Sequence, residues 1–249
     1  RLLFLWCNTT PLVEADRSLD PIPQTAKDGT WEDVFTNRDA LHAAVSRDDG
    51  KTWAGFREIR LNPLRYDADF AEKARHDFSV HQPQAMELPG GKVLVACGQA
   101  PEVRCLLVFD PDWLEEKTRR CDFSKGLDEW STQKYFAGIR GHCAYNRTAG
   151  PGLIGHPDDP DRKVLQLHHI PDDRLVHDTD GATWNFLAAH AGELTVRLRL
   201  QAGGGGARIS LLDRWVNPTD PYVADYANYL LEVTGSGRMS ESEIVEPGQ

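Results

Sequence analysis

Residues 46–53 read Ser-Arg-Asp-Asp-Gly-Lys-Thr-Trp and lie between two stretches that have the pattern of short β-strands. In such a segment an aspartate side chain accepts hydrogen bonds from backbone N–H groups ahead of it, and a glycine supplies the positive φ that closes a tight loop. We assign these roles to Asp48 and Gly50, and we expect Trp53 to cover the turn at the start of the return strand. The sequence therefore predicts a β-hairpin, with Asp48 and Asp49 as turn-forming residues rather than catalysts.

The spacing S-x-D-x-G-x-T-W in residues 46–53 resembles the Asp-box, or BNR repeat, of the sialidase superfamily, and every specified position matches. The resemblance implies a β-propeller whose blades are four-stranded meanders. In these blades the Asp-box joins the third strand to the fourth, on the face away from the substrate. Asp-box propellers include sialidases, other glycoside hydrolases, polysaccharide lyases and non-enzymatic binders, so the motif predicts the fold more specifically than the reaction.

Short strand patterns occur on both sides of the motif in the first 120 residues. They cover residues 1–7, 41–45, 56–61, 80–88, 92–97 and 104–109. In the blade that the resemblance implies, the first three are the second to fourth strands, and the last three begin the next blade. The long connections 8–40 and 62–80, and the loop 98–103, then lie on the substrate face.

The character of the sequence changes near residue 120. Before it, Asp110 is expected to cap a helical turn that begins at Pro111. After it, Asp-Phe-Ser-Lys-Gly-Leu-Asp-Glu-Trp-Ser at 122–131 resembles the start of jelly-roll accessory domains attached to glycoside hydrolases. Further strand patterns are found at 135–139, 164–169, 183–186, 193–200, 208–213 and 227–233. Their spacing predicts a β-sandwich.

The sequence therefore predicts an all-β fold in which an incomplete Asp-box propeller precedes a jelly-roll-like β-sandwich. We expect the last blades of the propeller in residues 1–120, the sandwich in 121–235 and a flexible tail in 236–249. The chain begins with the apolar residues that follow Arg1, without a Met or a basic leader, so we expect it to be a fragment or a processed form. We expect a secreted or periplasmic protein whose signal region is not part of this sequence.

Composition excludes several classes of partner. The 249 residues are 40% hydrophobic and 27% charged, and they contain no apolar run approaching the roughly 20 residues of a membrane span. The net charge is −10, without a basic cluster, which argues against nucleic acid. An acidic chain still accepts an anionic substrate where arginines gather in a cleft.

The five cysteines, at positions 7, 97, 105, 121 and 143, form no C-x-x-C pair and have no histidine at zinc-ligand spacing. The sequence thus predicts neither a metal site nor a cofactor. Because their number is odd, at least one thiol has no partner within the chain, and buried free cysteine is the simplest interpretation.

The candidate site residues lie on the segments assigned to the substrate face. The proposed catalytic residues are Asp39, Asp67 and His81, and the proposed substrate-binding residues are Arg38, Arg65, Gln82, Gln99 and Arg104. Carboxylates and a histidine can act as general acid and base. A guanidinium presents a rigid fork that matches a sugar carboxylate, which favours the arginines as ligands for an acidic sugar. Each of these arginines can equally be solvated or pair with a nearby aspartate.

Sialidases themselves use three arginines, a tyrosine paired with a glutamate, and an aspartate on a mobile loop. This set does not transfer residue by residue, because the sequence holds no tyrosine–glutamate arrangement, and Tyr66 has no supporting motif. Three functions therefore stay open. The first is a glycoside hydrolase that removes a terminal, in particular an acidic, sugar from a glycan or polysaccharide. The second is a propeller that binds glycans without turnover, and the third is a polysaccharide lyase.

Overall fold

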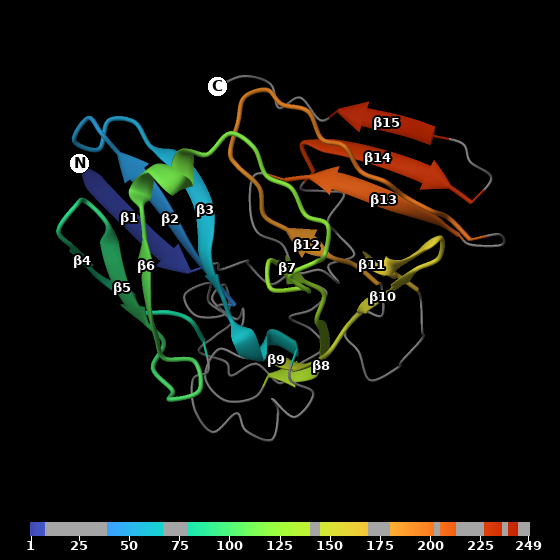
Figure 1. Ribbon diagram of the computed structural model, residues 1–249, viewed down its shortest axis with the longest axis horizontal. Coiled ribbons are helices and arrows are strands. Elements are labelled where there is room, and N and C mark those ends of the chain that lie inside the picture. Colours follow the sequence, from blue (N-terminus) through green and yellow to red (C-terminus); the bar gives the residue numbers. More distant parts are fainter. Residues whose placement is uncertain are drawn as a thin grey trace, which may run out of the picture. The chain divides into compact units, whose positions relative to one another are not determined.

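The first antiparallel sheet consists of β1 (Leu2–Cys7), β2 (Ala40–Ser46) and β3 (Ala54–Leu61), with β2 in the centre, as the computed structural model shows (Figure 1). These strands coincide with the strand patterns expected around the Asp-box. β2 is buried along its whole length. The described part of the protein comprises residues 1–7, 39–66, 79–139, 145–168, 180–201, 205–212, 227–235 and 239–243.

Side-chain hydrogen bonds fix the turn between β2 and β3. The Oγ atom of Ser46 accepts a bond from the N–H of Gly50 at 2.8 Å and donates one to Asp48 at 2.9 Å. Asp48 accepts bonds from the backbone N–H of Thr52 at 2.9 Å and from its hydroxyl at 2.7 Å. These bonds hold the pKa of the Asp48 carboxyl below its usual value. Gly50 has a φ of 89° and Asp49 one of 61°, so the predicted turn roles are confirmed.

We expect Ser46→Ala to lower the free energy of unfolding by about 1–2 kcal/mol, because the N–H of Gly50 loses its acceptor and Asp48 loses a donor. Urea unfolding followed by tryptophan fluorescence measures this change. Thr118→Ala is the matched control, since it removes an exposed hydroxyl outside the turn. Equal unfolding midpoints for the two variants would show that the turn bonds add nothing to stability.

The second antiparallel sheet is formed by β4 (Gln84–Glu87), β5 (Val93–Cys97) and β6 (Cys105–Phe109), in that order. It corresponds to the predicted strands of the next blade, although β4 is shorter than the pattern 80–88. The two sheets share a core cluster of buried side chains: Leu41, Val80, Val93, Val95 and Cys97. Leu3, Leu5 and Ile59 of the first sheet pack against this cluster. The alternation of side chains along β1 and β5 thus directs one face of each strand into a common core.

A short 3-10 helix, η4 (Pro111–Glu115), packs against the β2–β3 hairpin. The side chain of Asp110 caps it by accepting a bond from the N–H of Asp112 at 3.0 Å, as the sequence predicts. Arg47 of the hairpin donates bonds to Asp112 and Glu115, at 2.6 and 3.1 Å. The guanidinium of Arg57 lies 3.5 Å from the centre of the Trp113 ring, which adds a cation–π contact.

The rest of the described chain forms small antiparallel sheets. Three of them have two strands: β7 (Trp130–Ser131) with β12 (Thr183–Trp184), β8 (Lys134–Ile139) with β9 (Tyr145–Thr148), and β10 (Leu153–His156) with β11 (Asp159–Leu165). A three-stranded sheet has the order β13 (Gly206–Leu211), β14 (Tyr229–Thr234) and β15 (Met239–Glu243). Within the described residues no sheet closes on itself. The all-β class is therefore confirmed, while the propeller and the sandwich stay predictions.

Two expectations for this part of the chain need correction. The stretch 193–200 belongs to none of the described strands: Leu194, Val196 and Leu198 alternate as in a strand, but they are 43–50% exposed. Conversely, β15 lies inside the predicted flexible tail, because its backbone pairs with the edge of β14. Contacts divide the chain into one unit, which contains Arg1–Ala188, and a second unit formed by most of the chain from Ala189 onward. The predicted boundary near residue 120 lies within the first unit and stays a prediction.

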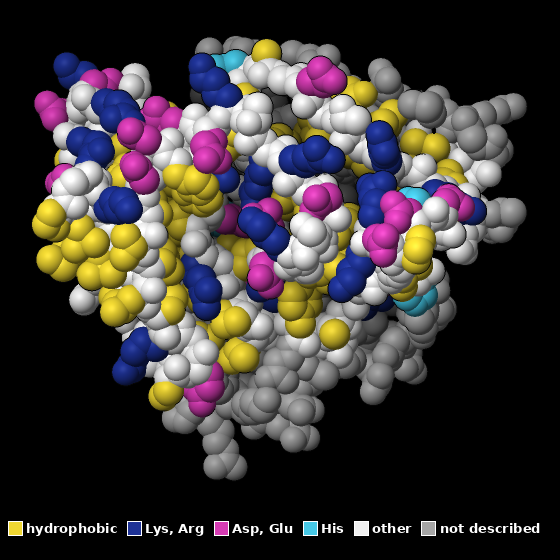
Figure 2. All heavy atoms as spheres, in the orientation of Figure 1, with side chains coloured by type: hydrophobic (Ala, Val, Ile, Leu, Met, Phe, Trp, Pro, Cys, Tyr) yellow, Lys and Arg dark blue, Asp and Glu magenta, His cyan; other side chains and the backbone are white. Residues whose placement is uncertain are grey.

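The outer faces of the first two sheets are apolar. On β1 and the hairpin, Phe4, Trp53 and Phe56 are 36–52% exposed, and Phe4 packs against Trp53. On β6, Leu106 and Val108 are 72% and 53% exposed. Figure 2 shows apolar side chains gathered over the sheet β4–β5–β6, at the left of the view. Among the described residues, no helix combines the length and the apolar character that crossing a membrane requires.

Candidate functional site

The strand ends of the first two sheets lie at two opposite ends of these sheets, which hold different loops. Leu2 at the start of β1 pairs with the last residue of β2, beside the turn between β2 and β3. Arg1 donates a hydrogen bond to the carbonyl of Gly91 in the β4–β5 turn, at 3.1 Å, which brings that turn to the same end. At the opposite end, the Sγ of Cys7 lies 3.7 Å from the carbonyl oxygen of Val80. This opposite end, called the loop end below, contains the ends of β1, β3 and β5 and the starts of β2, β4 and β6.

Three predicted substrate-binding residues meet at the loop end: Gln82, Gln99 and Arg104, here called the polar triad. The amide of Gln99 donates a hydrogen bond to the side-chain oxygen of Gln82. Nη2 of Arg104 donates to the carbonyl of Gln99 at 2.6 Å. All three side chains are exposed, and Gln82 has a φ of 54°, which turns the chain before β4. Among the described residues, the Arg104 guanidinium bonds to this carbonyl alone, and a guanidinium has five N–H donors.

His81 precedes the polar triad in the chain but is buried, with 5% of its surface exposed. Its Nδ1 lies 3.4 Å from the carbonyl oxygen of Ser79, and its own carbonyl accepts a bond from the N–H of Gly98 at 3.1 Å. These contacts tie the start of β4 to the end of β5. His81 therefore lies beside the polar triad, and its role as an acid or base stays a prediction.

Asp39 is completely buried at the loop end. Its two carboxylate oxygens accept hydrogen bonds from the amides of Asn62 at 3.0 Å and Gln133 at 3.4 Å. The N–H of Asn62 also donates to the Asp39 carbonyl at 2.6 Å. This arrangement joins the start of β2 to the segment after β3. Asp39 thus links segments of the chain through buried hydrogen bonds, and its catalytic role stays a prediction.

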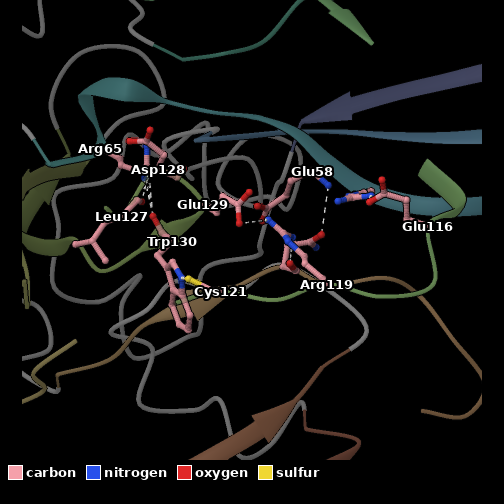
Figure 3. Close-up of polar contacts among 11 residues, drawn as sticks. Glu58, Arg65, Glu116, Arg119, Cys121, Leu127, Asp128, Glu129 and Trp130 are labelled. Carbon is pink, nitrogen blue, oxygen red and sulfur yellow. Dashed lines mark hydrogen bonds and ion pairs between the residues drawn. The ribbon is translucent and has the colours of Figure 1, made fainter. Parts of the chain in front are cut away.

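Arg65, in the 3-10 helix η3 (Pro63–Tyr66), is 4% exposed and directs its guanidinium at backbone carbonyls (Figure 3). Nη2 donates to the carbonyls of Leu127, Asp128 and Trp130, each at 2.9 Å, and Nε donates to Trp130 at 3.0 Å. Nη1 donates to the carbonyl of Asn62 at 2.8 Å. All three guanidinium nitrogens of Arg65 thus donate to backbone carbonyls, so the geometry gives Arg65 a structural role. The hydroxyl of the neighbouring tyrosine also bonds to Trp130.

A buried acid and histidine face each other on β2 and β3. His42 and Glu58 are cross-strand partners, each side chain is 6% exposed, and the histidine Nε2 lies 4.0 Å from the glutamate Oε1. Burial raises the pKa of Glu58 to about 7 and lowers the pKa of His42 to about 4. Both groups are therefore neutral between these values. The ring of Trp6 stacks on His42 at 5.2 Å and closes this face.

Charged side chains of η3 and of the segment after η4 also affect the pKa of Glu58. Arg119 forms an ion pair with Glu129 at 3.3 Å and bonds to the carbonyl of Asn185 (Figure 3). Arg119 and Arg65 oppose the increase in the pKa of Glu58, while Glu129 adds to it. Desolvation remains the larger effect, since the pKa lies well above the usual value of a glutamate.

A second buried ionic cluster lies outside the loop end. Lys134 on β8 pairs with Asp180, and their side chains are 9% and 7% exposed. The other carboxylate oxygen of Asp180 accepts a bond from the N–H of His168 at 2.6 Å. The His168 ring is half exposed, with its Nδ1 4.0 Å from the same oxygen. The cluster links three segments of the chain, around Lys134, His168 and Asp180.

Arg38 and Asp67 lie outside the described residues, so their predicted roles stay predictions. Across the described part of the chain, no group of three or more His, Cys, Asp or Glu side chains could hold a metal ion. A scan against models of known protein families finds no match for this chain, and a search of curated proteins finds none either. The function proposed below therefore rests on the sequence motif at residues 46–53 and on the geometry of the loop end.

The sequence pointed to the polar triad through its loop positions but missed the pair of His42 and Glu58. A glutamate between two arginines in the stretch Arg-Glu-Ile-Arg is typical of a solvated strand face. Alternation alone does not place residues 42 and 58 opposite each other, because the register of β2 and β3 shifts between Leu41 and His42 and again between Ala43 and Val45.

Proposed function

We propose that this protein is a carbohydrate-active enzyme of the sialidase superfamily that hydrolyses a terminal, acidic glycoside from a glycan or polysaccharide. The observation that carries the proposal is the Asp-box hairpin, with its complete side-chain hydrogen bonding, at the end of the sheets opposite the polar triad. Propellers of the family that the motif resembles have this polarity, with the Asp-box remote from the substrate.

The order of the strands supports the same proposal. In the proposed propeller, the three strands of the first sheet are the second to fourth strands of one blade and those of the second sheet are the first to third strands of the next. The two sheets share one core cluster, as neighbouring blades do. Their outer faces expose large apolar side chains, as expected for blades that pack against neighbouring blades. This supports a propeller in which residues 1–109 supply parts of two consecutive blades.

The chemistry of the polar triad suits an acidic sugar. The free donors of Arg104 match the two oxygens of a carboxylate, and charge-assisted bonds of this kind are roughly twice as strong as neutral ones. The amides of Gln82 and Gln99 provide donors and acceptors for sugar hydroxyls. In the proposed enzyme, Asp39, Asp67 and His81 are the candidates for acid–base catalysis, and Arg38 is a further candidate ligand for the carboxylate.

One observation favours the alternative of a glycan-binding protein without turnover. The polar triad is exposed, whereas Asp39 and His81 are buried and engaged by neighbouring groups. An exposed binding surface without an accessible acid or base binds sugars but does not cleave them. A lyase is the third possibility, and its unsaturated product absorbs in the ultraviolet.

The experiment that separates these functions combines glycan-array binding with product analysis. The protein is incubated with sialosides, uronate-containing glycans and neutral glycans, and released sugars are measured by chromatography and by ultraviolet absorbance. Release of an acidic sugar supports the proposal. Binding without any product supports the binder, and absence of both binding and release contradicts a carbohydrate function.

We expect Arg104→Ala to weaken binding of carboxylate-bearing glycans about 10- to 100-fold, because a charge-assisted hydrogen bond contributes about 1.5–3 kcal/mol. Binding of neutral glycans should change little. Titration calorimetry measures both affinities, and Arg120→Ala is the matched control, since Arg120 is an exposed arginine outside the loop end. An equal loss for acidic and neutral glycans would argue against carboxylate recognition by Arg104.

A further inference from the structure

Two free thiols face each other at the loop end. Cys97 is the last residue of β5 and Cys105 the first of β6, and the two residues are direct partners in the antiparallel register. Their sulfur atoms are 3.3 Å apart. Direct partners in antiparallel strands have Cα atoms about 4.5–5.5 Å apart, which lies within the range of about 4.4–6.8 Å that disulfides span.

The connecting loop holds the two thiols in this position. Gly98 follows Cys97 with a φ of 83°, and a side chain there would come within 2.6 Å of the carbonyl oxygen of Val103. The N–H groups of Val103 and Arg104 both donate to the carbonyl of Ala100, at 3.1 and 2.9 Å. Ala100 and Val103 are buried, at 5% and 1%. The loop is therefore a closed turn that returns the chain directly to Cys105.

The two thiols differ in their surroundings. Cys97 is 3% exposed within the apolar core, and this burial raises its pKa to about 12. Cys105 is only partly buried on β6, which is an edge strand among the described strands of its sheet. A thiol reacts as its thiolate and needs access to its partner. Cys105 is therefore the thiol that reacts first, and Cys97 is the thiol that resolves the intermediate.

We propose that Cys97 and Cys105 form a reversible disulfide that closes the loop carrying Gln99 and Arg104. The thiolate of Cys105 attacks one sulfur of a small-molecule disulfide, which forms a mixed disulfide and releases one small thiolate. Cys97 then loses its proton and attacks the Cys105 sulfur, which releases the second thiolate. Two protein thiols are oxidised to one disulfide, and the small disulfide is reduced to two thiols.

The covalent link joins the two strand ends that support the polar triad. A loop closed by both the strand ladder and a disulfide has fewer conformations than one closed by the ladder alone. A secreted or periplasmic location, as the sequence predicts, is the kind of environment in which disulfides persist. Any effect on sugar binding rests on the proposed function, whereas formation of the disulfide does not.

The test is a redox equilibration of the full chain with oxidised and reduced glutathione, followed by acid quenching, alkylation and peptide mapping by mass spectrometry. Oxidised protein should lose the mass of two hydrogen atoms and take up two alkyl groups fewer than reduced protein. A peptide pair linked through Cys97 and Cys105 should appear, and reduced glutathione should reverse it. This readout does not involve glycans, so it fails or succeeds independently of the proposed function.

Variants identify the pair. Cys97→Ser and Cys105→Ser should each abolish the linked peptide, while Cys7→Ser and Cys121→Ser should leave it unchanged. Cys7 is the stringent control, because its side chain packs against the same core cluster as Cys97. The inference is overturned if the wild-type protein keeps both thiols open to alkylation in excess oxidised glutathione, or if Cys97 links to Cys7 instead.

Discussion

Glu58→Gln should change the pH dependence of stability strongly, because the pKa of the Glu58 carboxyl is far from its usual value. Relative to the wild type, the free energy of unfolding of the variant should rise by about 3 kcal/mol between pH 4 and pH 8. The reason is the pKa of Glu58, which burial raises from 4.5 to about 7. A shift of this size corresponds to about 3 kcal/mol of preference for the neutral acid.

The sign follows from the protons that each state binds. Below pH 4.5 the carboxyl is protonated in both the folded and the unfolded chain, so the stability linked to Glu58 is fully present. As the pH rises through 7, the folded protein must ionise a buried acid and this stability is lost. For His42, whose pKa falls from 6.5 to about 4, stability is present above 6.5 and lost as the pH falls through 4. In the wild type the two slopes oppose each other between pH 4.5 and 6.5.

Single variants separate the two slopes. In Glu58→Gln only the pH dependence linked to His42 remains, so the free energy of unfolding should rise from pH 4 to 6.5. His42→Phe keeps an aromatic ring against Trp6. Only the pH dependence linked to Glu58 then remains, so the free energy of unfolding should fall from pH 4.5 to 7. Urea unfolding at unit pH intervals measures these curves, with exposed Glu102→Gln as the control. If the free energy of unfolding changed with pH in the same way in the wild type and in both variants, Glu58 and His42 would not be a neutral pair in the folded protein.

Arg65→Ala should be the most destabilising substitution among the predicted site residues, with a loss of about 4 kcal/mol in the free energy of unfolding. It removes five hydrogen bonds, four of them to the carbonyls of Leu127, Asp128 and Trp130, in a segment more than 60 residues further along the chain. Each lost bond costs about 0.5–1.5 kcal/mol. The carbonyls of Leu127 and Trp130 keep a second donor, from the Trp130 N–H and the Tyr66 hydroxyl, which holds the sum below the maximum.

Arg65→Lys tests the geometry of the fork. Lysine keeps the charge but offers a compact ammonium in place of a planar guanidinium, so about half of the loss should remain. Tyr66→Phe removes one neighbouring bond to Trp130 and should cost about 1 kcal/mol. Calorimetric melting and urea unfolding compare the three variants. A substrate-binding Arg65 would give the opposite pattern, with unchanged stability and weaker binding of acidic glycans.

The local elements were predictable because their causes are local. In the hairpin, Ser46, Asp48 and Gly50 interact with residues at most four positions away. The cap at Asp110 depends on a residue two positions ahead. Side-chain alternation was sufficient to place five of the six strands of the first two sheets within a few residues, and it placed β4 with less accuracy.

The sequence by itself thus determined the all-β class, the turn at residues 46–53, the strands around it and the loop that carries Gln99 and Arg104. Only the tertiary structure decided that Asp39 is buried and hydrogen-bonded, that Arg65 binds carbonyls and that Glu58 is a neutral acid. The physical reason is that burial and hydrogen-bond partners come from residues distant in the chain. The partners of Arg65 lie up to 65 positions away, and Gln133 lies 94 positions from Asp39.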